Sequence, residues 1–97
     1  MPITVIVELH AKPGERAELV RRMEHLVAQA GPTLAGFLGS ERYEVIDNPD
    51  ALVEIARWES PESRLAHLED AATSGSYAPV FELLATPARA TILRALS

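Results

Sequence analysis

Residues 3–10, ITVIVELH, are the segment that most limits what this chain can fold into. The run alternates and is rich in β-branched residues, so it predicts a β-strand. One face of that strand is fully apolar and consists of Ile3, Val5, Val7 and Leu9. The other face is mixed and consists of Thr4, Ile6, Glu8 and His10. The first face needs a core, whereas the second suits an interface or a ligand cavity as well as solvent.

Two more strands are expected in the middle of the chain. Residues 36–46 (GFLGSERYEVI) and 51–59 (ALVEIARWE) flank DNPD, a turn sequence that predicts a hairpin. In the second of these strands, Val53 and Ile55 share one face. Leu52 and Trp58 share the other, so neither face suits solvent alone. A last strand is expected at about residues 88–96 (ARATILRAL).

Between the first two strands, the apolar spacing becomes that of a helix. Within KPGERAELVRRMEHLVAQAG, one helix face is expected to carry Leu19, Val20, Met23, Leu26, Val27 and Ala30. Gly31 followed by Pro32 is expected to stop this helix. His25 lies on the opposite side from the stripe and is expected to face solvent.

The stretch RWESPESRLAH, residues 57–67, leads from the third strand into a second helix. Ser60 suits the N-cap, Pro61 the first helical position and Glu62 the first turn. The core stripe of this helix is expected to consist of Leu65, Leu68 and Ala72. His67 lies off that stripe. TSGS, residues 73–76, is expected to end the helix, and a short third helix should then carry Tyr77, Val80, Phe81 and Leu84.

This order of elements predicts an α+β fold in one domain, residues 1–97. The economical arrangement is ferredoxin-like βαββαβ, a four-stranded antiparallel sheet with its helices on one face. Such a sheet leaves its second face bare. We therefore expect a homodimer of C2 symmetry that packs sheet against sheet. Tyr43, Glu8 and His10 are expected to belong to that interface.

Composition excludes several classes of function. The formal net charge of −5 argues against a nucleic-acid partner, which would require a basic surface. The chain has no cysteine, and His10, His25 and His67 are not at a recognised metal spacing, so no metal site is expected. No apolar run approaches the roughly 18 residues of a membrane span, and no signal peptide is recognised, so we expect a cytoplasmic protein.

Several segments together resemble a known family. VEIARWESPESRLAH is the most telling piece, and ITVIVELHAKPGERAELVRRMEHLV, GFLGSERYEV and YAPVFELLATPARATILRAL accompany it in order. They resemble the antibiotic biosynthesis monooxygenase (ABM) family of dimeric α+β barrel proteins. The resemblance implies a small cofactor-independent monooxygenase that oxidises an anthrone, a quinol or a similar aromatic molecule with molecular oxygen.

A haem-degrading branch of that family has a similar fold and carries Asn, Trp and His at three positions. Those positions fall near Val7, His67 and Tyr77 in this chain, and none of the three residue types matches. We therefore expect no haem cofactor.

The candidate site consists of side chains that could meet in one pocket. Trp58 is expected either to fill a core or to form a flat wall for a planar substrate. His67 is either a surface histidine or, with an ordinary pKa near 6.5, a group that takes a phenolic proton. Tyr77 packs by its ring, and its hydroxyl could reach a cavity edge. Val7 and Phe81 are expected to line the same pocket.

Two hypotheses follow for the function. The first is a monooxygenase acting on a quinol, an anthrone or a similar aromatic small molecule. The second is a non-catalytic dimer that binds a small ligand or is associated with stress. An apolar cavity that opens near His67 and Tyr77 would favour the first, and a cavity filled by side chains would favour the second.

Overall fold

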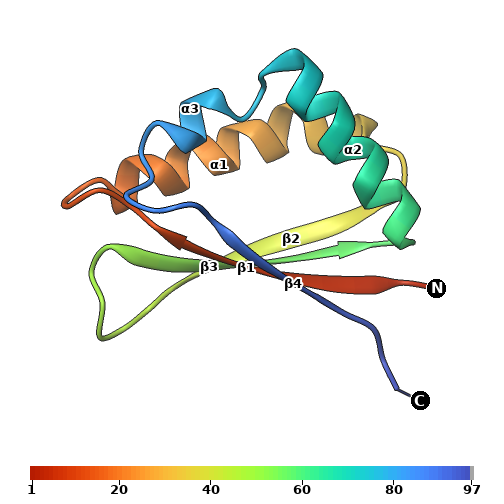
Figure 1. Ribbon diagram of the computed structural model, residues 1–97, viewed down its shortest axis with the longest axis horizontal. Coiled ribbons are helices and arrows are strands. Elements are labelled where there is room, and N and C mark those ends of the chain that lie inside the picture. Colours follow the sequence, from red (N-terminus) through yellow and green to blue (C-terminus); the bar gives the residue numbers. More distant parts are fainter. Residues whose placement is uncertain (97) are drawn as a thin grey trace.

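The computed structural model describes residues 1–96. Along the chain its elements are β1 (Ile3–His10), α1 (Arg16–Ala30), the 3-10 turn η1 (Gly31–Thr33), β2 (Phe37–Glu44), β3 (Ala51–Trp58), α2 (Pro61–Ser74), α3 (Ala78–Phe81) and β4 (Arg89–Leu93). The three α-helices lie on one side of the sheet (Figure 1). The structure confirms the α+β ferredoxin-like fold expected from the sequence.

The sheet has the strand order β2-β3-β1-β4, and all neighbouring strands are antiparallel. The register pairs Ile3 with Trp58 and Leu9 with Leu52, which places all four on the helix-covered face. The two central strands are therefore those with apolar residues on both faces. β4 is an exposed edge strand and is shorter than expected, because residues 94–96 continue without a strand partner.

Two apolar clusters form the core on the helix-covered face. The first joins the sheet to α1 and α3 through Leu9, Ala11, Leu19, Met23, Leu52, Val80 and Leu83. The second consists of Ile3, Val5, Ala56 and Trp58, against which Leu34 and Phe37 pack. The stripe expected on α1 is confirmed in part, since Leu19 and Met23 are buried and the others are half-buried.

The prediction that α2 packs a stripe of apolar residues into the core is wrong. Leu65 and Leu68 are 58% and 37% exposed, and Ala72 is also exposed. Ala71 is the one buried residue of this helix. The inward face of α2 instead carries Arg64, His67 and Leu68, which border a cavity rather than a packed core.

Both ends of α2 are fixed as the sequence predicts. The Ser60 hydroxyl accepts a hydrogen bond of 3.1 Å from the Ser63 backbone N–H, which caps the helix. Gly75 ends it in a left-handed conformation, with φ of 69°. Gly36, at φ of 79°, approaches the first turn so closely that a Cβ atom would lie 2.3 Å from the Ser63 hydroxyl. The start of β2 and the start of α2 are therefore in direct contact.

The end of α1 differs from the expectation in detail. The helix ends at Ala30, but Gly31 keeps a right-handed conformation, with φ of −49°, and the chain continues into η1. Gly31 is buried against the Phe37 ring, which would be 3.4 Å from an added Cβ. Here the glycine provides space for a ring and not a left-handed cap.

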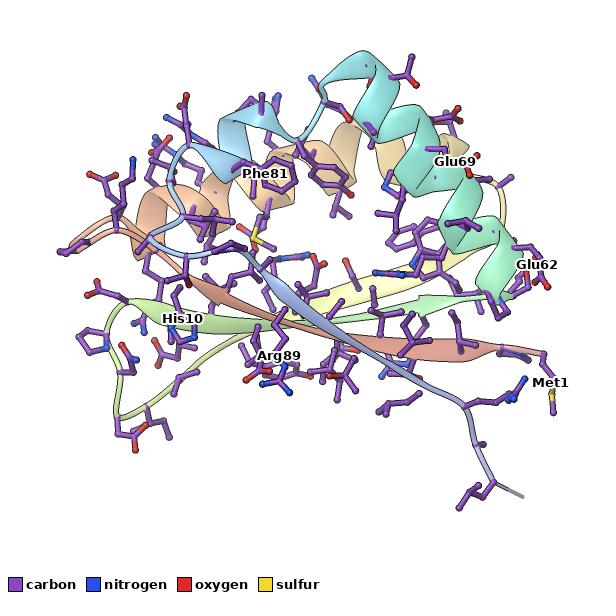
Figure 2. All side chains as sticks on the ribbon, viewed as in Figure 1. Met1, His10, Glu62, Glu69, Phe81 and Arg89 are labelled. Atoms are coloured by element: carbon purple, nitrogen blue, oxygen red, sulfur yellow. The ribbon has the colours of Figure 1, made fainter. Side chains whose placement is uncertain are left out.

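The second face of the sheet has no covering element within residues 1–96. Register places Ile6, Ile55 and Val53 on this face, together with Tyr43 and Leu93. Arg89 projects from the same side, away from the helices (Figure 2). No helix among these residues is long and apolar enough to cross a membrane.

Replacing Leu52 by Ala should lower the free energy of unfolding by about 2–5 kcal/mol, because its side chain is 1% exposed in the core. Leu65→Ala is the matched control and should change it by less than about 0.5 kcal/mol. Urea unfolding at one fixed protein concentration measures both. Equal losses for the two variants would contradict the described packing of α2.

Candidate functional site

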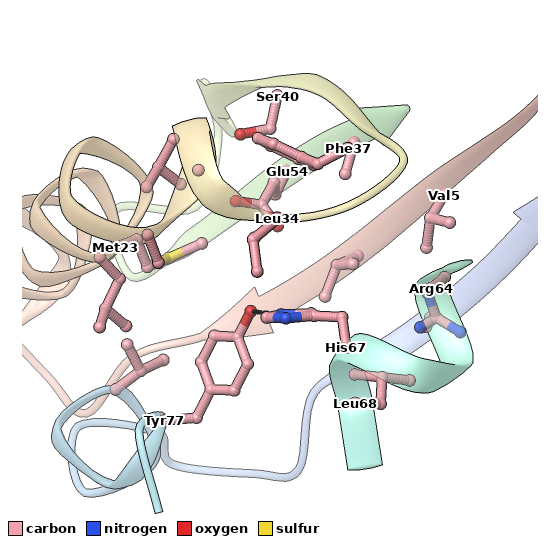
Figure 3. Close-up of a pocket in the computed structure, with 18 of the residues that line it drawn as sticks. Val5, Met23, Leu34, Phe37, Ser40, Glu54, Arg64, His67, Leu68 and Tyr77 are labelled. Carbon is pink, nitrogen blue, oxygen red and sulfur yellow. Dashed lines mark hydrogen bonds between the residues drawn. The ribbon is translucent and has the colours of Figure 1, made fainter. Parts of the chain in front are cut away.

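A cavity of about 280 Å³ lies between the helix-covered face of the sheet and the helices. Its volume is near the lower end of ligand pockets, which are roughly 300–1,000 Å³. Most of the lining is apolar, and β1 contributes Val5, Val7 and Leu9. Figure 3 shows side chains from α1, α2 and the sheet converging on this space. The cavity therefore suits a small ligand with a mainly apolar body.

Aromatic rings form a continuous wall along the cavity. Phe37 packs on Trp58 with ring centroids 5.1 Å apart, and Trp58 stacks on His67 at 5.2 Å with an interplanar angle of 29°. Tyr77 meets the His67 ring edge-on at 5.6 Å. Phe81 stacks on Tyr77 at 5.9 Å and is itself 60% exposed. Flat surfaces of this kind accommodate planar molecules.

His67 and Tyr77 are joined by a hydrogen bond of 2.7 Å between Nε2 and the hydroxyl. They point toward one another from α2 and from the residue before α3 (Figure 3). Burial lowers the pKa of His67 below its ordinary value, an effect that Asp70 opposes and Arg64 reinforces. Burial, together with the charge of Glu54, raises the pKa of Tyr77. A neutral imidazole and an intact phenol therefore meet at the cavity. In the tautomer protonated on Nδ1, Nε2 accepts the bond from the Tyr77 hydroxyl, and in the other tautomer Nε2 donates it.

Glu54 brings a carboxylate to the cavity that sequence reasoning did not include in the site. Its side chain is 19% exposed, and burial raises its pKa although Arg42 partly offsets the effect. Arg42 Nη1 donates to Glu54 Oε2 at 3.4 Å and to the Ser40 hydroxyl at 3.1 Å. Arg42 Nε is buried without a hydrogen-bond partner among the described residues. The sequence signal that could have revealed Glu54 as a site residue is its position on the same strand face as Leu52 and Ala56, which are apolar.

The structure brings the predicted site residues together around this cavity, namely Val7, Trp58, His67, Tyr77 and Phe81. Trp58 satisfies both alternatives, because it is only 5% exposed and still borders the cavity. His67 is half-buried and is not a solvated surface histidine. The chemical roles of these side chains stay predictions.

The other residues singled out in the sequence lie outside the cavity. Tyr43 is 48% exposed on the second face of the sheet, where its hydroxyl donates to Glu41. Glu8 and His10 are exposed on β1, and His25 is exposed on α1 as expected. Within residues 1–96, no three His, Asp or Glu side chains are grouped to hold a metal ion.

Comparison with known proteins identifies relatives of the chain. The family model described as antibiotic biosynthesis monooxygenase matches residues 2–73, which confirms the resemblance noted in the sequence. A search of curated proteins found no match. Many solved structures are similar, and they share the fold.

Three of these structures illustrate the likeness. Rv0793 from Mycobacterium tuberculosis is 25% identical, with a TM-score of 0.80 over 100% of this chain and 97% of that one. A conserved protein from Methanosarcina mazei Go1 is 19% identical, with a TM-score of 0.81 over 97% and 92%. A mutant of SnoaB, a cofactor-independent oxygenase from Streptomyces nogalater, is 16% identical, with a TM-score of 0.82 over 99% and 94%.

His67 should titrate with a pKa below the ordinary value of about 6.5, because its burial disfavours the charged ring. The unfolded chain then binds more protons than the folded chain in the window between the two pKa values. The free energy of unfolding should therefore fall as the pH is lowered through that window.

Proton NMR of the imidazole, assigned with His67→Gln, measures the pKa directly. In urea unfolding between about pH 7.5 and pH 5, the His67→Gln variant should lose less stability than the unmutated protein. A midpoint at or above 6.5 would contradict the buried, neutral histidine.

Proposed function

Because the chain belongs to the antibiotic biosynthesis monooxygenase family, we propose that it is a cofactor-independent monooxygenase acting on a quinol, an anthrone or a similar aromatic small molecule. The observation that carries this proposal is the hydrogen-bonded pair of His67 and Tyr77 inside an apolar cavity walled by Trp58. The second substrate is molecular oxygen. The similar fold of SnoaB, a cofactor-independent oxygenase, supports the assignment.

The cavity favours a planar substrate. A substrate ring packed against Trp58, with its reacting carbon at the edge of the His67 ring, would gain about 0.5–1.5 kcal/mol beyond the burial of its area. The side chains that β1 contributes to the cavity are apolar and cannot form hydrogen bonds with the substrate. Polar groups of the substrate are thereby directed to the few polar side chains that line the cavity, which are Ser40, Glu54, Arg64, His67, Ser76 and Tyr77.

Oxidation of an anthrone illustrates the chemistry that these residues support. A base removes one proton from the reacting methylene, and the resulting anion passes one electron to oxygen. The substrate radical and superoxide then combine into a carbon–oxygen bond, and the removed proton returns to the distal oxygen as a hydroperoxide. Loss of the second methylene proton breaks the O–O bond, and hydroxide leaves with that proton as water. One oxygen atom stays in the product as a carbonyl, and no external electron donor is consumed.

In this proposal His67 is the base and Tyr77 holds it in position. The lowered pKa of His67 keeps the imidazole neutral at pH 7, so that Nε2 is able to take a proton. Tyr77 keeps its proton because burial raises its pKa. When its hydroxyl turns from His67 Nε2 to the developing substrate oxyanion, it stabilises that oxyanion and leaves the lone pair of Nε2 free for the substrate proton. Trp58, Val7 and Phe81 bind the rings of the substrate.

The alternative function is a dimer that binds a small ligand, or is associated with stress, without catalysis. The open cavity beside His67 and Tyr77 supports catalysis over a filled, vestigial site. Binding of quinols without any oxygen consumption would instead support the alternative.

We also propose that the protein is a homodimer. The second face of the sheet carries Ile6, Ile55 and Val53 beside charged groups, and a second copy of the chain would cover it. Domains near 100 residues bury only part of their surface when alone, so such a contact would add to stability. C2 symmetry is the commonest arrangement for two identical faces.

His67→Ala should lower turnover by roughly 10²-fold, the low end for a positioned acid–base group. His25→Ala, which removes an exposed histidine of α1, should leave turnover unchanged. Oxygen uptake with a panel of anthrones and quinols measures both after metals are stripped from the protein. If the two variants behave alike, His67 is not the base.

Turnover of the unmutated protein should rise with pH through the pKa of His67, since only the neutral ring accepts a proton. The midpoint should coincide with the His67 pKa measured by NMR. A rate that falls with increasing pH over this range would contradict the assignment of His67 as the base.

Light scattering after size exclusion at micromolar concentration should give about twice the chain mass of 10.6 kDa. Ile6→Asp, on the open face, should shift the protein to the monomer mass because the aspartate would be buried unpaired. Leu65→Asp, an exposed position on α2, should keep the dimer. A monomer mass for the unmutated protein would contradict the dimer.

A further inference from the structure

The arginines of this chain divide into those with a carboxylate partner and those without one. Six of the eight lie within 4.0 Å of a glutamate oxygen: Arg16, Arg21, Arg22, Arg42, Arg57 and Arg89. Within residues 1–96, Arg64 and Arg94 have no such partner. Arg94 is exposed after β4, whereas Arg64 is half-buried and borders the cavity.

Arg64 occupies the same inward face of α2 as His67, one turn earlier in the helix. It borders the cavity beside Leu68 of α2 (Figure 3). Ala90 of β4 and Ala88, which precedes that strand, also line the cavity. Its guanidinium donates no hydrogen bond to any group within residues 1–96. The Arg64 guanidinium, which is planar and always charged, can therefore donate hydrogen bonds to a ligand at this edge of the apolar cavity.

We propose that Arg64 binds a carboxylate of the substrate, so that the cavity selects planar aromatic acids over their neutral analogues. This inference rests on the proposed function, because it places the rings of the same substrate against Trp58 and His67. A guanidinium pairs with a carboxylate through two parallel hydrogen bonds, which fixes orientation as well as charge.

The other charged groups of the cavity agree with one orientation of the substrate. Glu54 is the acidic residue among those that line the cavity, and it comes from β3 in the sheet rather than from α2. A carboxylate near Glu54 would be repelled, whereas a phenolic hydroxyl there would find an acceptor. Asp70 lies one turn after His67 on α2 but is exposed and does not line the cavity. The acid end of the substrate therefore belongs at Arg64 and its hydroxyl end at Glu54, His67 and Tyr77.

Trp58 makes a direct binding assay possible, because it is the one tryptophan of the chain and borders the cavity. Anthraquinone-2-carboxylate is the anionic probe, and 2-(hydroxymethyl)anthraquinone is its neutral analogue of similar shape. Quenching of Trp58 fluorescence, corrected for probe absorption, gives the dissociation constant of each. We expect the carboxylate to bind the unmutated protein about tenfold more tightly, as hydrogen bonds to charged groups allow.

Arg64→Gln should weaken binding of the carboxylate by about tenfold and leave binding of the neutral probe unchanged. Unchanged neutral binding also demonstrates that the variant is folded. Arg94→Gln is the matched control, since it removes the same charge from the other unpaired arginine, and it should preserve the preference. Arg64→Lys should retain part of the preference, because it keeps the charge and loses the planar fork.

The binding results distinguish a failure of the proposed role of Arg64 from a failure of the proposed function. Equal binding of the two probes, with no effect of Arg64→Gln, would overturn the role of Arg64 while leaving a cavity that binds planar aromatics. Equal weakening by Arg64→Gln and Arg94→Gln would also overturn it, because the effect would then be one of net charge. If neither probe quenches Trp58, both this inference and the proposed function are overturned.

Discussion

The stacking of His67 on Trp58 is the contact on which the rest of the site depends. α2 buries only Ala71 of its own residues, so it has no apolar stripe that could hold it against the sheet. It is fixed instead at its capped ends and by the rings of His67 and Trp58, 5.2 Å apart. Because the helix is supported at these points and not along its length, a cavity of about 280 Å³ remains beneath it. The same imidazole then bonds to Tyr77 and closes the aromatic wall.

Most of the fold could be predicted from the sequence, because strand alternation and turn residues are local signals. β1 has the bounds and the buried face that ITVIVELH indicates, and the capping of α2 by Ser60 follows directly from SPE. The prediction that Leu65 and Leu68 form a core stripe is wrong for a physical reason. Apolar spacing reveals which side of a helix is apolar, but not whether a packed core or a cavity lies beneath it. Here the inward face carries Arg64 and His67 beside Leu68 and Ala71, and Leu65 faces outward.

The site could be predicted only in outline. Trp58, His67 and Tyr77 were singled out, and they line one cavity, but the sequence did not reveal their order in space or the bond between His67 and Tyr77. Glu54 was missed as a site residue, because a charged residue in a strand is normally read as solvent-facing. Its place depends on the pairing of β1 with β3 and on Arg42 from β2, which are contacts far apart in the chain. Long-range register, and not local pattern, creates the polar part of the cavity.

Whether the cavity beside His67 binds the substrate is tested most directly by a crystal structure of the protein with a bound anthraquinone, the stable product of anthrone oxidation. We expect the rings of the product to lie in the cavity against Trp58 and beside His67. One carbonyl oxygen should be within about 3.2 Å of His67 Nε2 or of the Tyr77 hydroxyl, as a hydrogen bond requires. A product bound outside the cavity, with side chains filling the space beside His67, would contradict this expectation.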